Sequence, residues 1–234
     1  MPNYITVRVA MLAEDMERNA LNEKGEFDLD AIRPMPDDLN LPKGSFQMLA
    51  VRAAQAIDGN DEAALKEIEA EADRQLPHVV YDTEYRTIED LYALGKLYLR
   101  NETLYGAQTW YEWRVEQWGT KWNALDPKTV EAGDLKIACF QTAWDAPCKE
   151  LMEVLALRST APVWMEWADD DDYNGIRTSL STKEGTLEGM APLMLEETVV
   201  IEGDEGAEEA WCMATDGAWQ TDKLATVLHA LKGA

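Results

Sequence analysis

The N-terminal stretch alternates apolar and polar side chains with the period of two that is typical of a β-strand. Ile5, Val7 and Val9 share one side, with polar residues between them. We therefore predict a strand over residues 4–12, and the following residues 14–21 have the composition of a short helix.

The pattern changes between Ser45 and Trp118, where apolar residues recur at every third or fourth position. Ser45 is a residue type that caps helix N-termini, so it predicts a helix that runs to about Ile57. Further helices are predicted over residues 61–76, 87–99 and 107–118.

Strand patterns return after this helical region. Asp145 is expected to cap a helix that carries Pro147 in its first turn, where proline is tolerated. Strands are predicted over residues 135–142, 163–167, 176–180 and 186–190, the last two joined as a hairpin around Lys183–Glu184–Gly185. The tail adds strand patterns at residues 198–202 and 210–213 and a closing helix at 222–231.

Short strands mixed with helices, without strict βα alternation, indicate the α+β class. The order fits a ferredoxin-like split βαβ core with a helical insertion. We expect residues 1–190 to form this domain, with the insertion at about residues 45–118, and residues 191–234 to form a small, acidic C-terminal α/β extension.

The charge of the chain narrows the range of partners. There are 45 acidic and 21 basic residues, which gives a net charge of −24 and an isoelectric point near 4.3. Such a surface repels phosphate backbones and attracts basic surfaces. Direct nucleic-acid binding is therefore disfavoured, and a basic host protein or nucleic-acid-binding complex is the expected partner.

The acidic excess is concentrated between Ser159 and Ala218, where 15 acidic residues are opposed by Arg177 and Lys183 alone. This concentration predicts a partner-binding patch, while solubility or a salt-adapted host proteome is the alternative explanation. The candidate patch residues are Asp169, Asp170, Asp171, Asp172, Glu202, Asp204, Glu205, Glu208 and Glu209.

No catalytic centre, metal site or cofactor site is expected. Cys139, Cys148 and Cys212 form no CxxC pair, so they are interpreted as buried small residues in a reducing compartment. His78 and His229 lie far apart and lack the acidic company of a metalloprotease motif.

One acidic turn has the beginning of a calcium-binding loop. Asp170, Asp172, Asn174 and Gly175 fit the first positions of such a loop, but Ser181 stands where a bidentate glutamate is required. The flanking segments also have strand rather than helix patterns. A solvated turn is therefore favoured over a calcium site.

Two tryptophans, Trp118 and Trp122, flank a short glycine-containing stretch. They could form a platform for a ligand or partner, with Lys121 and Asn123 supplying polar contacts. The alternative is a buried corner in which the rings pack and Gly119 permits a tight turn. The stretch lacks the preceding glycine loop of a phosphate-binding motif.

Five stretches together resemble the YubB family of ferredoxin-like proteins, which is found on conjugative plasmids and phages. The resemblance implies a ferredoxin-like fold and carriage on a mobile element, and it implies no activity, because the family has no known function. The chain departs from the family pattern in the four aspartates that precede Tyr173. The stretches are residues 1–6, 34–39, 118–124, 142–147 and 168–175.

The beginning of the chain lacks the basic and apolar regions of a signal peptide, and no apolar run reaches the roughly 20 residues of a membrane span. We therefore expect a cytoplasmic protein with no membrane partner. Three functions remain open: a non-enzymatic inhibitor of a host defence system of the anti-CRISPR or anti-restriction type, a structural or regulatory interaction module of plasmid or phage biology, and an uncharacterised enzyme.

Overall fold

The computed structural model describes residues 3–75, 87–169 and 177–190. The chain divides into two compact units. The sheet unit contains residues 1–34 and 114–234, and the helical unit is the continuous segment Met35–Trp113 between them. The helical unit therefore begins and ends earlier than the expected insertion at residues 45–118.

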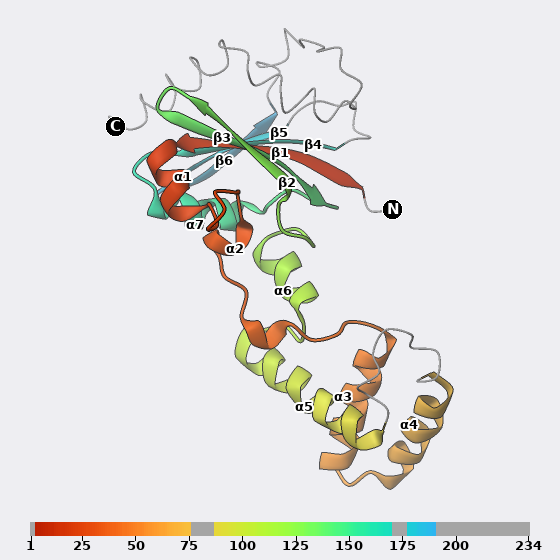
Figure 1. Ribbon diagram of the computed structural model, residues 1–234. Coiled ribbons are helices and arrows are strands. Elements are labelled where there is room, and N and C mark those ends of the chain that lie inside the picture. Colours follow the sequence, from red (N-terminus) through yellow and green to blue (C-terminus); the bar gives the residue numbers. More distant parts are fainter. Residues whose placement is uncertain (1–2, 76–86, 170–176, 191–234) are drawn as a thin grey trace. The chain divides into compact units, whose positions relative to one another are not determined.

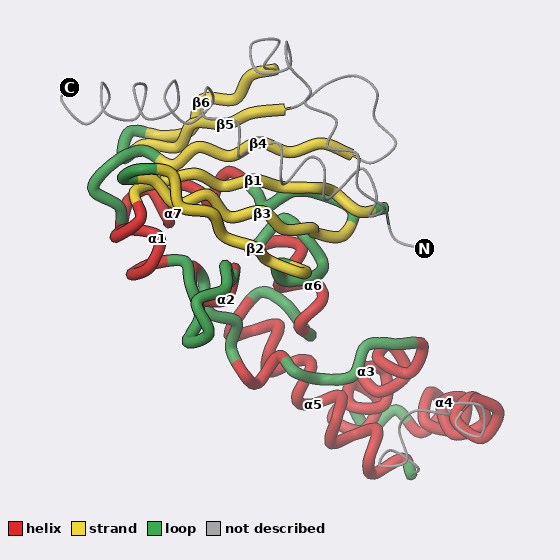
Figure 2. Tube along the Cα trace, turned by 45° about the horizontal axis from the view of Figure 1, so that its top comes forward, coloured by secondary structure: helices red, strands yellow, loops and turns green. Residues whose placement is uncertain are grey.

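The sheet unit is an α+β structure built on six antiparallel strands in the order β2-β3-β1-β4-β5-β6 (Figure 2). The α+β class predicted from the sequence is confirmed. Its elements are β1 (Tyr4–Leu12), α1 (Ala13–Asn19), α2 (Leu29–Ile32), β2 (Leu125–Ala132), β3 (Leu135–Ala143), α7 (Lys149–Arg158), β4 (Val163–Asp169), β5 (Arg177–Thr182) and β6 (Gly185–Met190).

Helices α1, α2 and α7 lie on one side of this sheet (Figure 1). Phe27, just before α2, stacks on Phe140 of β3 with ring centroids 4.8 Å apart. Phe140 is paired with Val7 of β1. Because side chains alternate along a strand, Val7 and Val9 face the helices, whereas Arg8 faces the other side.

Both sides of the central strand are buried, from Ile5 to Met11. On the side of Arg8, an apolar cluster contains Ala10, Leu135, Ile137 and Cys139. The predicted alternation of β1 is therefore present, but its polar positions are enclosed as well. This burial places Arg8 where its charge requires a partner.

The edge strand β2 was missed by the sequence analysis. Asp126 and Pro127 interrupt its apolar pattern, and the register with β3 shifts between Leu125 and Lys128. Asp126 also has a positive φ of 45°. A proline and a bulge are tolerated here because β2 has a neighbour on one side only.

The predicted cap of α7 is wrong. Asp145 accepts a hydrogen bond from Ala146 N, and the helix begins at Lys149 after Cys148. The backbone N–H of Cys148 donates to the carbonyl of Trp118. This tie holds the chain in an extended conformation through Cys148, so the helix cannot begin earlier.

The helical unit contains four α-helices and one short 3₁₀ helix among its described residues. Ser45 is the first residue of its helix and Gly44 takes the cap position, so Ser45 is not the predicted N-cap. The elements are η1 (Asp37–Leu39), α3 (Ser45–Asp58), α4 (Glu62–Gln75), α5 (Ile88–Tyr105) and the first half of α6 (Trp110–Gln117).

Helices α3 and α5 approach each other at a site of small side chains. Gly95 of α5 faces Ala50 and Ala54 of α3, and a Cβ atom at position 95 would lie 2.0 Å from the Ala50 carbonyl oxygen. Leu91 and Leu94 belong to the same apolar cluster. The helices pack backbone to backbone here, which only glycine at position 95 permits.

Both ends of α5 are capped. Thr87 and Asp90 form a capping box, with Asp90 N donating to the Thr87 hydroxyl at 3.2 Å and Thr87 N donating to the Asp90 carboxylate at 2.9 Å. Gly106 ends the helix in the left-handed conformation with φ of 73°. The predicted helix therefore exists and extends further than residue 99.

Candidate interaction site

The loop between α6 and β2 carries the tryptophan motif, and Trp118 is its buried anchor. The Trp118 side chain is fully enclosed. Its Nε1 donates to the carbonyl oxygen of Arg33 at 2.9 Å, and the Arg114 guanidinium lies 4.9 Å from its ring centroid. For Trp118 the buried-corner explanation therefore holds, and this residue offers no surface to a partner.

Gly119 permits the turn that follows this anchor. Its φ is 82°, and a Cβ atom would lie 2.6 Å from the backbone nitrogen of Cys148. Glycine is required both for the left-handed conformation and for this close approach. Burial raises the pKa of the neighbouring Cys148 thiol, so a reactive thiolate is disfavoured at this position.

Thr120 fixes the loop to the end of β3. Its buried hydroxyl donates to the carbonyl of Ala143 at 3.0 Å and accepts from Ala143 N at 3.3 Å. Two hydrogen bonds to one residue determine both the distance and the orientation of the two segments. The loop is therefore held in one position relative to the sheet.

Asn123 holds the other end of the loop. Its Oδ1 accepts from Leu29 N and from Ala124 N, both at 2.8 Å, and its Nδ2 donates to Asp28 Oδ1 at 2.6 Å. Asp28 in turn caps α2 by accepting from Asp30 N. Asn123 is consequently a positioning residue rather than a partner contact.

Lys121 and Trp122 lie between these fixed points and belong to a partly exposed aromatic surface. The Lys121 Nζ is 5.1 Å from the ring centroid of Trp122 and 4.7 Å from that of Trp144. The Tyr4 ring lies 6.3 Å from the Trp122 ring at an interplanar angle of 43°. We call Tyr4, Lys121, Trp122 and Trp144 the aromatic surface.

Trp144 is the most exposed member of this surface. It is 49% exposed, and its φ of 74° lies in the left-handed region. A bulky side chain is strained there, where glycine or asparagine would be the easier choice. Its backbone N–H donates to the carbonyl of Asn3 at 2.9 Å. A partly exposed indole is thus held on a strained backbone at this position.

Sequence reasoning brought together Trp118, Lys121, Trp122 and Asn123, and the structure separates their roles. Lys121 and Trp122 belong to the surface, whereas Trp118 and Asn123 hold it. Trp144 was not selected as a candidate, although it flanks the loop whose hydrogen bonds fix Lys121. The available signal in the sequence was a tryptophan shortly after the predicted strand 135–142, next to Asp145.

Most of the candidate acidic patch falls outside the described residues. Asp169 ends β4, where its backbone pairs with Ile5. The candidates outside the description are Asp170, Asp171, Asp172, Glu202, Asp204, Glu205, Glu208 and Glu209. The same holds for the candidate calcium turn up to Gly175, for His78 and His229, and for Cys212.

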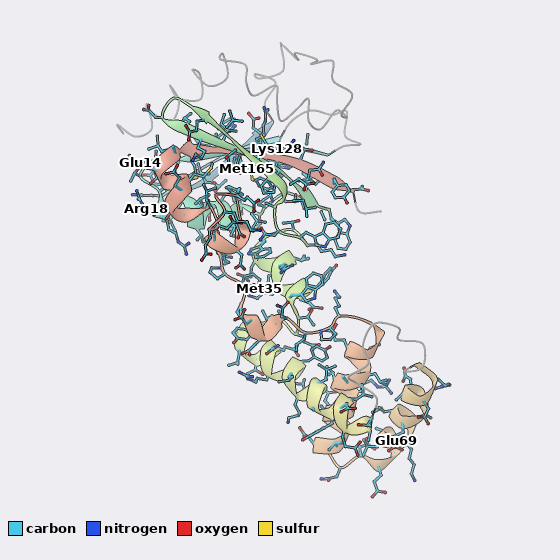
Figure 3. The ribbon with its side chains drawn as sticks, viewed as in Figure 1. Glu14, Arg18, Met35, Glu69, Lys128 and Met165 are labelled. Atoms are coloured by element: carbon cyan, nitrogen blue, oxygen red, sulfur yellow. The ribbon has the colours of Figure 1, made fainter. Side chains whose placement is uncertain are left out.

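An acidic surface is nevertheless present in the described helical unit. Helix α4 packs Ile68 and Ala72 into the core and directs carboxylates outward. Glu69 lies on this helix (Figure 3). The exposed acidic residues on or just before α4 are Asp61, Glu62, Glu67, Glu69 and Asp73.

A buried ion pair lies inside the sheet unit. Arg8 of β1 and Glu166 of β4 are neighbours in register, with Arg8 NH2 and Glu166 Oε2 2.5 Å apart and side chains 6% and 4% exposed. Trp164 Nε1 donates to the second Glu166 oxygen at 3.0 Å. Both Glu166 oxygens accept a hydrogen bond within the sheet, whereas the buried Arg8 Nε has no hydrogen-bond partner. A buried pair held in this way is the pattern of a structural ion pair.

No three histidine, cysteine or acidic side chains of the described residues are grouped so as to hold a metal ion. A depression beside the start of α1 is lined by Glu14, Asp134 and Thr160, but no basic residue or thiol lines it. The Thr160 hydroxyl there donates to the buried Asp15 at 2.8 Å.

Fold and site together define an α+β protein with a rigidly held aromatic surface. No protein-family model matches the chain, and no curated protein matches it. The structure is similar to the crystal structure of a protein api92 from Yersinia pseudotuberculosis, of family DUF1281, with 12% sequence identity, coverage of 82% of this chain and 99% of that chain, and a TM-score of 0.40. At this TM-score the similarity carries no argument about fold or function.

Within the described part of the chain, no helix is both long enough and apolar enough to cross a membrane.

Proposed function

We propose that this protein acts by binding rather than by catalysis, and that its acidic surface engages a basic, nucleic-acid-binding host protein or complex. The net charge of −24 carries this proposal. A field of that sign accelerates encounter with basic surfaces, and the interaction weakens as salt screens it. The outward carboxylates of α4 add to the same field.

In its fuller form, the proposal is a cytoplasmic inhibitor that a phage or plasmid directs against a host defence system of the anti-CRISPR or anti-restriction type. The resemblance of the five sequence stretches to the YubB family supports carriage on a mobile element. An acidic protein that occupies a basic nucleic-acid channel would inhibit without turnover. The proposal requires no cofactor and no direct contact with nucleic acid or membrane.

We also propose that the sheet unit has a ferredoxin-like core. In support, β1, α1, β2, β3, α7 and β4 follow one another as βαββαβ, and their strands lie in the order β2-β3-β1-β4. This is the arrangement of a split βαβ core. The hairpin of β5 and β6 then extends the sheet beside β4.

The test is affinity capture of the tagged protein from nuclease-treated host lysate over a salt series, read by mass spectrometry. We expect enrichment of one basic nucleic-acid-binding complex that fades as salt rises. Neutralising Glu62, Glu69 and Asp73 by amide substitution should weaken that capture, and so should neutralising Glu202, Asp204, Glu205, Glu208 and Glu209. Capture that is unchanged in both variants and at high salt would contradict the acidic-surface mechanism.

A second candidate is a structural or regulatory interaction module of plasmid or phage biology that binds an apolar partner. The exposed, strained Trp144 favours it. Binding of this kind buries apolar area and persists at high salt. If capture of the partner is lost on substitution of Trp144 and is unchanged as salt rises, this candidate is favoured over the first.

A further inference from the structure

The aromatic surface already holds a cation in the free protein. Both the Trp122 and the Trp144 ring centroids lie within about 6 Å of the same ammonium group, at 5.1 and 4.7 Å from Lys121 Nζ. Among the described residues, no carboxylate forms an ion pair with Lys121. In a strongly acidic chain, this lysine is held by indole faces instead of by a negative charge.

The site is built to keep the two indoles in place. Thr120 binds both backbone groups of Ala143, the residue before Trp144. Asn123 binds the backbone after Trp122 and the start of α2. The backbone strain at Trp144 is maintained by this surrounding structure, and strain of this kind collects at ligand sites. The two rings are therefore positioned before any partner arrives.

We propose that Trp122 and Trp144 form the recognition site for an arginine side chain of the basic partner, and that Lys121 occupies this site in the free protein. This inference rests on the proposed function, because it assigns a specific contact to the same basic partner. An arginine guanidinium is planar, stacks on aromatic faces and is more weakly hydrated than an ammonium, so it replaces lysine favourably on an indole. The flexible stem of Lys121 allows its ammonium to move into water.

The charge of the chain selects this occupant over an anionic one. A ligand carboxylate could pair with Lys121 but would be repelled by the net charge of −24. A basic partner is attracted by that charge, and arginines are abundant on surfaces that bind nucleic acid. When arginine binds, the Lys121 ammonium moves from the indole rings into solvent. The affinity for arginine should therefore depend on which residue stands at position 121.

The experiment titrates the full chain with an N-acetylated, amidated nona-arginine peptide by calorimetry, with nona-lysine as the comparison probe. We expect Trp144→Gly to weaken nona-arginine binding roughly tenfold and to reduce the preference for arginine over lysine. Glycine suits the φ of 74° at this position, so the fold is preserved. Leu157→Ala, at a 60% exposed apolar position on α7, is the matched control and should change binding less than about twofold.

Lys121→Ala provides the second arm. It opens the site and should strengthen nona-arginine binding by about fivefold, because one weak cation–π contact no longer competes. Lys149→Ala removes the same charge from an exposed position on α7 and corrects for the change in net charge. The indole ¹⁵N–¹H resonances of Trp122 and Trp144 should shift on titration, which shows directly where the peptide binds.

The results distinguish failure of the arginine-site inference from failure of the proposed function. If Trp144→Gly binds nona-arginine as tightly as the unmodified chain, the inference is wrong. If either acid-neutralised variant, that of α4 or that of Glu202, Asp204, Glu205, Glu208 and Glu209, then loses binding, the proposed function still stands; if neither does, both fall. A weaker complex for Lys121→Ala than for Lys149→Ala would identify Lys121 as a donor to the partner and would also overturn the inference.

Discussion

The longest polar contacts of the sheet unit span more of the sequence than the longest ones of the helical unit. Arg8 and Glu166 are 158 positions apart, and Asp15 and Thr160 are 145 apart. In the helical unit, the buried Asn101 reaches back only 63 positions, to the carbonyl of Asp38. The sheet unit must therefore bring together both segments that flank residues 35–113, which is slower and more costly in chain entropy.

The interiors differ in chemistry as well. The sheet unit encloses the charged Arg8 in its central strand and the polar Thr120 in the loop that precedes β2. The helical unit is held by the close approach of Gly95 to the alanines of α3. The sheet unit contains a buried ion pair and the helical unit a backbone-to-backbone helix contact, so different substitutions should break each unit.

The largest effect is expected from breaking the buried ion pair. Arg8→Met leaves the buried Glu166 without its ion-pair partner, which should destabilise the sheet unit by about 3–5 kcal/mol. The double variant Arg8→Met, Glu166→Leu removes both charges and should recover much of that loss. Urea unfolding followed by circular dichroism measures both variants. If the double variant is as unstable as the single one, the loss does not come from leaving Glu166 unpaired, and this explanation of the single variant would be wrong.

Gly95→Ala should have the next largest effect and should act on the other unit. The added methyl group would meet the Ala50 carbonyl and the Ala54 side chain, so α3 and α5 must separate at a loss of about 3 kcal/mol. Hydrogen exchange should show faster exchange in α3 and α5 and unchanged protection in β1 and β3. Leu97→Ala, at an exposed position of the same helix, is the control. Equal deprotection of both units would remove the distinction between them.

Thr120→Val should destabilise the sheet unit by about 1–3 kcal/mol, because it leaves both backbone groups of Ala143 without their hydroxyl partner. The volume is nearly unchanged, so the loss measures the hydrogen bonds themselves. Thermal unfolding measures stability. Thr129→Val on the exposed part of β2 should change stability by less than about 0.5 kcal/mol.

Glu112 gives the helical unit a dependence on pH. Burial raises the pKa of this carboxylate, but hydrogen bonds from Thr109 and the charge of Lys43 outweigh it and hold the pKa below its ordinary value of 4.5. Its contribution is therefore present above pH 4.5 and lost as pH falls through the lowered folded-state pKa. Glu112→Gln should be less stable near neutral pH by about 1 kcal/mol or less.

The difference between Glu112→Gln and the unmodified chain should shrink as pH falls below 4.5 and disappear below the lowered folded-state pKa, which unfolding curves at several pH values can follow. A difference that stays constant across the acidic range would assign the effect to packing rather than to charge.

The smallest effect on stability is expected for Trp144→Gly. Relief of the left-handed strain offsets the lost ring contacts and the greater freedom of glycine in the unfolded chain, so the net change should stay within about 1 kcal/mol. Trp122→Ala, by contrast, should lose the Tyr4 contact without any relief of strain. Thermal unfolding of the two variants compares them, and a larger loss for Trp144→Gly would contradict the assignment of strain to that position.

The helices and strands with uninterrupted patterns were predictable from the sequence. The apolar spacing around Leu91 and Leu94 predicted α5, and the hairpin around Gly185 was placed correctly. The errors lie where tertiary contacts decide. Strand β2 was missed because Asp126 and Pro127 obscure a pattern that an edge position tolerates, and the start of α7 was misplaced because Trp118 binds the Cys148 backbone.

The candidate site shows the same division. The sequence indicated that residues 118–123 are unusual, but it could not separate contact from support, because that depends on which side chains are enclosed. Trp118 and Asn123 proved to be supports. Trp144 joined the surface because antiparallel pairing brings the end of β3 beside the beginning of β1.

The sequence by itself determined the charge of this protein, its α+β class and the positions of its amphipathic helices, since these follow from residue types and local spacing. Only the tertiary structure decided that Arg8 is buried against Glu166, that Gly95 allows two helices to touch, and that Lys121 lies on two indoles. Each of these depends on residues brought together from separate segments, and a local pattern carries no information about such distances.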